Sequence, residues 1–221
     1  GSLEITNTSS EGVYFKTNTK VIGNAKNKQT ILSGTTITFA FKEGMTISSP
    51  WNGDAIFTNG CTLTEDTEIV GNLNLTGGLL DLNGNEMHIT GDVTINGSGT
   101  LELNGGTLIV DGNFKYNSTK ITTLNDGKIY LKGDFTQNYS AGSDHFQAKE
   151  GNTFVLCGDD KQTISFDSTY SYFGSLEITN TSSEGVYFKN ETKVVGKATN
   201  YKEISGTTIT FSNSAILNGS W

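Results

Sequence analysis

A period of about 21 residues constrains the fold of this chain more than any other feature of the sequence. The pattern Gly-Asx-apolar occurs four times, and its glycines are Gly71, Gly91, Gly112 and Gly133. A second pattern, Leu-Asn, recurs at the same spacing at Leu82, Leu103 and Leu124. Two independent markers that share one period predict a solenoid, in which each repeat forms one coil of a continuous stack.

Within each period the apolar residues fall in pairs two positions apart, which is the periodicity of a β-strand. Met87 and Ile89 are followed 21 residues later by Leu108 and Val110. Each period contains three such pairs, so we expect three short strands per coil of about 21 residues. The sequence therefore predicts an all-β fold, a right-handed parallel β-helix that forms one continuous domain over residues 1–221; the hand follows from the general rule for parallel crossovers.

The Gly-Asx positions are expected to form the corners of the coils, where glycine supplies a positive φ and Asn or Asp tolerates one. We expect the side chains that follow the glycines to bond the backbone of the turns; these are Asn72, Asp92, Asn113 and Asp134. The Leu-Asn marker predicts an asparagine ladder formed by Asn83, Asn104 and Asn125. Calcium binding is the alternative for such residues, but the tight nonapeptide pattern of calcium-binding β-rolls does not occur.

A much longer repeat encloses these coils. Residues 1–16 recur without a change at 174–189, and Trp51 has its counterpart in Trp221. The match indicates a duplicated unit of roughly 170 residues, so the chain covers about one and a quarter copies, and the second copy begins near residue 174. We expect the parent protein to be a longer tandem array in which neighbouring repeats are partners.

Composition restricts the classes of function. The net charge is −8 and all basic residues are lysines, so the basic face of a nucleic-acid-binding protein is not expected. No apolar run reaches the length of about 18 residues that a membrane span requires. The sequence shows no signal peptide, and its apparent start within a repeat leaves open that an export signal was lost.

No catalytic residue, cofactor or metal site is predicted. Asp81 and Glu102 are expected to point outward from adjacent coils, at a distance suited to glycoside hydrolysis, but the column continues with Thr123 and gives no sign of a cleft. His88 and His145 lack partners at metal-ligand spacing and are expected to be ordinary surface residues. Cys61 and Cys157 should lie about 20 Å apart along the axis, too far for a disulfide, so both are expected to be free thiols.

Two surface features are candidates for binding. The outward positions between one series of apolar pairs form a stripe of mostly apolar residues: His88, Ile109, Tyr130 and Val155. Such a stripe can be a binding surface or a lateral packing surface, or it can be covered by the insertion at residues 138–150.

The second feature is an aromatic group in a less regular coil: Phe166, Tyr170, Tyr172 and Phe173. Aromatic faces stack on sugar rings, which makes a carbohydrate site possible. Strand alternation predicts that half of these residues point into the core instead.

The segments KQTISF at 161–166 and FGSLEITNTSSEGVYF at 173–188, together with the Gly-Asn-Leu-Asn-Leu coils, resemble repeats of large secreted bacterial surface proteins. These are β-helical adhesins and stalks, broadly similar to filamentous haemagglutinin and autotransporter passengers. The resemblance implies an extracellular location at the bacterial cell surface and a structural or adhesive role.

The leading hypothesis is therefore a stalk or spacer module that can self-associate or contact a surface glycan or protein. A carbohydrate-binding module that uses exposed aromatics is the alternative. A polysaccharide lyase or glycosidase is third, because enzymes of these classes also use this fold.

Overall fold

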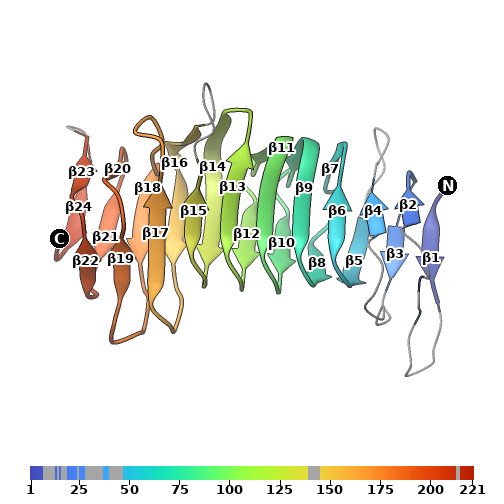
Figure 1. Cartoon of the computed structure of the whole chain (residues 1–221), viewed down its shortest axis with the longest axis horizontal. Helices are drawn as coiled ribbons and strands as arrows, with labels where there is room; N and C mark the ends of the chain where they lie inside the picture. The colour runs from blue at the N-terminus through green and yellow to red at the C-terminus, as the bar shows by residue number, and fades with distance from the viewer. Residues whose placement is uncertain are drawn as a thin grey trace.

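The structure is a computed structural model that describes residues 1–6, 13, 15, 19–23, 25–27, 37–39, 47–138, 145–212 and 215–221. These residues form strands and turns and contain no helix. The strands stack side by side into one elongated parallel β-helix, with the two ends of the chain at opposite ends of the stack (Figure 1). The all-β parallel solenoid predicted from the 21-residue period is confirmed.

Two long parallel sheets form the walls of the solenoid. The first contains eleven strands, in the order β1 (Leu3–Ile5), β3 (Ala25–Asn27), β5 (Ile47–Asn52), β8 (Thr67–Val70), β10 (Glu86–Ile89), β12 (Thr107–Val110), β14 (Thr122–Leu131), β16 (Phe146–Leu156), β18 (Ser175–Ile178), β21 (Ala198–Asn200) and β24 (Leu217–Gly219).

The second sheet contains β2 (Thr19–Val21), β4 (Ile37–Phe39), β6 (Ala55–Phe57), β9 (Leu73–Asp81), β11 (Val93–Glu102), β13 (Phe114–Ser118), β15 (Phe135–Gln137), β17 (Gln162–Phe166), β19 (Val186–Phe188) and β22 (Ile204–Gly206). β7 (Gly60–Thr62) pairs with the end of β9, and β20 (Thr192–Val194) pairs with β23 (Ile209–Phe211).

The third strand of each coil is short, and in several coils it is fused to one of the walls. The last residues of β9 and β11 pair as a separate register segment, with Leu101 opposite Leu80. The first residues of β14 and β16 do the same, with Leu124 opposite Ala148. Three strand segments per coil therefore exist, but bends rather than breaks separate some of them.

The predicted columns lie in register. Leu73, Val93, Phe114 and Phe135 stack in the second sheet, and Leu108 stacks between Met87 and Ile129 in the first. All of these side chains are buried. The ladder also crosses residue 174 without interruption, because β18 pairs with β16 in parallel register.

Glycine has a different role at the corners from the one expected. Gly91 and Gly112 do not have a positive φ; each donates its N–H to the carbonyl of the glycine one coil before it, at 3.0–3.1 Å. A Cβ on Gly91 would lie 2.8 Å from the oxygen of Gly71, and one on Gly112 would lie 2.7 Å from the oxygen of Gly91. Close approach of successive corners, not a left-handed backbone, therefore requires glycine here. The left-handed residues are instead Asn83 and Asn104, with φ of 49° and 47°.

An aromatic cluster fills the widest part of the core. The ring of Phe135 lies 5.0–5.7 Å, centroid to centroid, from five other rings, which come from four different coils. They are Phe114, Phe146, Phe154, Phe166 and Phe173. Such offset and edge-to-face contacts add to the stabilisation from burial. Phe135 is therefore the side chain on which several coils jointly depend.

Replacing this ring should destabilise the solenoid strongly. We expect Phe135→Ala to lower the free energy of unfolding by about 3–5 kcal/mol, because it removes buried area and leaves a cavity. Urea unfolding followed by circular dichroism measures the change. Thr136→Ala, at the neighbouring outward position of β15, is the control and should shift stability by less than about 0.5 kcal/mol. Similar effects for the two variants would contradict the central role of the aromatic cluster.

Candidate interaction surface

A ladder of Asx side chains runs along one corner of the solenoid. Each backbone N–H in the series Asn72, Asp92, Asn113 and Asp134 donates to the side-chain oxygen of the Asx residue one coil before it, at 2.7–2.8 Å. Asp54 begins this series, and the N–H of Thr163 accepts its end by donating to Asp134 at 2.7 Å. The side chains thus bond turn backbone, but in the next coil rather than in their own. We interpret this corner as structural.

The residues of the Leu-Asn marker do not form the expected ladder of asparagine amides. The amide of Asn104 donates to Asp81 at 2.8 Å and to Glu102 at 3.4 Å. The N–H of Asn83 also donates to Asp81, and Asn125 is exposed. Carboxylates in the neighbouring column are stronger acceptors than an amide oxygen and so replace it.

Asp81 and Glu102, the carboxylates weighed for catalysis, lie opposite each other on adjacent coils as expected. The amide of Asn104 bridges them from the side. This arrangement accounts for both carboxylates by hydrogen bonding within the wall.

The predicted outward stripe lies on the first sheet. His88, Ile109, Tyr130 and Val155 follow one another in register through β10, β12, β14 and β16. The first three are half-buried, whereas Val155 is only 3% exposed. Its register neighbours, Tyr130 and Glu177, are longer side chains on either side of it. The assignment of Val155 to a binding surface is therefore wrong.

The covering segment considered for this stripe lies partly outside the described residues, since 139–144 are not described. The described end of that insertion, from Phe146 to Ala148, pairs with Thr122 to Leu124 in the third strand of the coil. It thus lies on a different wall from the stripe.

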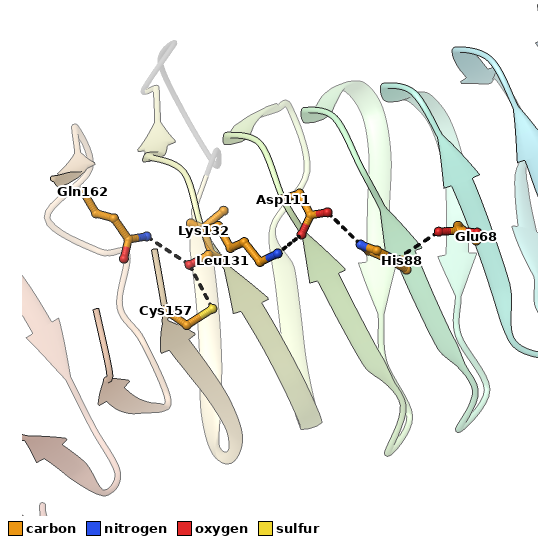
Figure 2. Close-up of polar contacts among 7 residues, drawn as sticks. All are labelled: Glu68, His88, Asp111, Leu131, Lys132, Cys157 and Gln162. Carbon is orange, nitrogen blue, oxygen red and sulfur yellow. Dashed lines mark hydrogen bonds and ion pairs between the residues drawn. The ribbon is translucent and has the colours of Figure 1, made fainter. Parts of the chain in front are cut away.

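A row of charged side chains borders the stripe, and sequence reasoning missed it (Figure 2). Nδ1 of His88 lies 3.3 Å from Glu68, and its Nε2 lies 2.9 Å from Asp111. The other oxygen of Asp111 lies 2.7 Å from Nζ of Lys132. His88 is therefore held between two carboxylates on neighbouring coils, which fits an imidazolium that donates from both nitrogens.

The charges of this row affect one another. Partial burial of Asp111 opposes ionisation, but the interactions with Lys132 and His88 outweigh it, so the pKa of the Asp111 carboxyl lies below its usual value. In turn, Asp111 raises the pKa of the Lys132 ammonium. Both groups are thus held in their charged forms at neutral pH.

Cys157 and Gln162 continue the polar contacts on the C-terminal side of this row, through the carbonyl of Leu131 (Figure 2). Burial raises the pKa of the Cys157 thiol even though Lys132 opposes the shift, so the group is a neutral thiol at neutral pH. A protonated thiol is a poor nucleophile and a poor metal ligand. Cys61 is buried, and both cysteines are free.

The aromatic group divides as strand alternation predicts. Phe166 and Phe173 lie in the core, whereas Tyr172 is half-buried and Tyr170 is 68% exposed. The ring of Tyr170 lies 5.1 Å from the ring of His145, and Nδ1 of His145 lies 2.9 Å from the hydroxyl of Ser168. Nζ of Lys193 lies 5.6 Å from the centre of the Tyr172 ring. These two tyrosines form a polar aromatic corner that is separate from the stripe on the first sheet.

The described residues contain no group of three or more side chains placed to hold a metal ion. In the same residues no helix is long and apolar enough to cross a membrane. Comparison of the chain with protein-family models, curated proteins and solved structures finds no match.

The charged row should make stability depend on pH. Because the folded-state pKa of Asp111 is lowered from 3.8, its contribution is present above that pH and is lost as the pH falls through the folded-state value. The raised pKa of Lys132 sets the upper limit, since the contribution of Lys132 is lost only above its usual value of 10.5. Asp111→Asn should therefore cost about 0.5–1 kcal/mol at pH 7 and almost nothing at pH 2.

Chemical unfolding of the two chains at pH 7 and pH 2 checks this expectation. Asp167→Asn is the matched control, because Asp167 is exposed and lies outside the row. An effect of Asp111→Asn that is the same at both pH values would contradict the ionic explanation.

Proposed function

We propose that this chain is a structural spacer, or stalk, module of an exported bacterial cell-surface protein, with adhesion or self-association as its output. The observation that carries the proposal is the parallel ladder, which includes eleven strands of one sheet and crosses the repeat boundary at β16 and β18. A fold built in this way gains length with every coil, at about 4.8 Å per coil.

The duplicated segments support the same function, because they repeat structure as well as sequence. Thr19 to Val21 pair with Ile37 to Phe39 in the first copy. Thr192 to Val194 pair with Ile209 to Phe211 in the second copy, in the same register. A unit that reproduces its own coil geometry can extend a stalk by duplication, since each coil depends only on its neighbours. An extracellular site of action is part of the proposal and rests on the resemblance to bacterial surface repeats.

Carbohydrate binding is the second candidate, and Tyr170 is the observation that favours it. An exposed tyrosine ring held by a neighbouring histidine presents a flat face of the kind on which sugars stack. Tyr172 and Lys193 provide further polar contacts nearby. This site would give a stalk an adhesive function rather than replace the stalk.

Small-angle X-ray scattering of the purified chain tests the spacer function. We expect a rigid rod whose length corresponds to eleven stacked strands, about 50 Å at the usual strand spacing. Scattering from a flexible or collapsed particle would contradict the proposal.

A glycan array tests the second candidate on the same chain. Saturable binding that Tyr170→Ala abolishes would establish an adhesive site at the aromatic corner. Tyr201→Ala is the matched control, because Tyr201 is equally exposed at 72% and lies away from His145. Binding that survives Tyr170→Ala would exclude this corner as the site.

A further inference from the structure

The C-terminal end of the solenoid repeats a part of the structure whose neighbour is known. β21 pairs with β24 through Ala198 and Leu217, and in the first copy β3 pairs with β5 through Ala25 and Ile47. The two copies also share the strand pairs of β2 with β4 and of β20 with β23, in identical register. Each residue near the C-terminal end therefore has a counterpart in the first copy.

These counterparts differ in burial. Ile47 is fully buried, whereas Leu217 at the same position is 49% exposed. Phe39 and Trp51 are fully buried, whereas their counterparts Phe211 and Trp221 are only half-buried. The same apolar surface is therefore covered in one copy and open in the other.

The next coil covers this surface in the first copy. β6 pairs with β4 and places Phe57 opposite Phe39, and β8 pairs with β5 and places Ile69 opposite Trp51. The rings of Phe39 and Trp51 make an edge-to-face contact at 4.9 Å, and the ring of Phe57 lies 5.7 Å from that of Phe39. Three aromatic rings thus form one cluster.

The second copy has two of these three rings and a hollow beside them. Phe211 and Trp221 make the same edge-to-face contact, at 5.1 Å and 77°. A hollow of about 250 Å³ adjoins them, lined also by Phe188 and Ile209 and by the segment from Ile204 to Thr207. No ring in this copy corresponds to Phe57.

We propose that this end face binds one further coil with the sequence of residues 52–70, supplied by another copy of the repeat. Its Ala-Ile-Phe strand pairs with β23, and its Phe57 ring enters the hollow beside Phe211 and Trp221. Its Ile69 covers Trp221. The inference rests on the proposed spacer function, because it names the partner of the end face.

Backbone chemistry favours a coil over a small apolar ligand. β23 and β24 are the last strands of their sheets, so one edge of each presents N–H and C=O groups toward the end of the stack. Only another strand pairs with such an edge along its length. A ligand that filled the hollow alone would leave those groups to water.

The opposite end requires a different partner, which gives the stacking its order. Leu176 is buried under the coil of β16, whereas its counterpart Leu3 at the N-terminal end is half-buried. The N-terminal face thus fits a coil like residues 146–173, and the C-terminal face fits one like residues 52–70. The two ends of this chain are not complementary, and we expect the unextended chain to be monomeric.

The test extends the full chain after Trp221 with a copy of residues 52–137 and measures hydrogen exchange by mass spectrometry. Peptides that span residues 209–219 should become at least about tenfold better protected, because their strands acquire hydrogen-bonded neighbours. Circular dichroism should show added strand content. No gain in protection, whether the extension folds or remains unfolded, would overturn the inference.

Two variants of the appended copy test the ring itself. Phe57→Ala in that copy should reduce the protection of residues 209–219 by at least about threefold. Ile56→Ala, at the adjacent outward position, should leave the protection unchanged. Equal protection in the two variants would show that no ring occupies the hollow. Failure of docking leaves the scattering of the unextended chain as a separate measure of the spacer function.

Discussion

The in-register parallel hydrogen-bond ladder between coils is the constraint on which the rest of this structure depends. A coil of this size cannot bury its own apolar side chains, so it is stable only when a neighbour lies about 4.8 Å away on each side. That distance requires Gly91 and Gly112 to stack without side chains and allows the Asx oxygens to reach the next backbone N–H. Columns of like residues follow from the same constraint, because each side chain meets its counterpart one coil away.

The sequence alone was sufficient to predict the regular part of this fold. The period of 21 residues places Val93 between Leu73 and Phe114, and alternation directs all three into the core, as the structure shows. The prediction fails where contacts run diagonally. His88 and Asp111 are 23 residues apart, so their contact depends on the side-chain directions at the edge of a strand. A strict 21-residue alignment pairs His88 with Ile109 instead.

Buried polar residues are the other part that the period could not predict. Gln162 lies in the core and makes four hydrogen bonds. Its amide donates to the carbonyls of Leu131 and Gly133, and its oxygen accepts from Gly158 and from Asn180. Such a side chain is tolerated in an apolar interior only because every polar atom has a partner. Each partner comes from the irregular coil around residues 157–162 or its neighbours, where the repeat pattern is weakest.

Regular stacking also creates the main hazard of the fold, because each end of the stack is a sheet edge that could pair with any strand. Apolar shape restricts that choice here. The hollow beside Phe211 and Trp221 fits an aromatic ring at one position of the incoming coil, and the exposed Leu217 needs an apolar neighbour beside it. A strand shifted by one residue would point its apolar side chains to solvent and leave the hollow empty. Side-chain packing therefore selects the partner and its register, whereas the backbone supplies most of the attraction. In a tandem array the same selection keeps successive units in one register, so a stalk gains length without losing straightness.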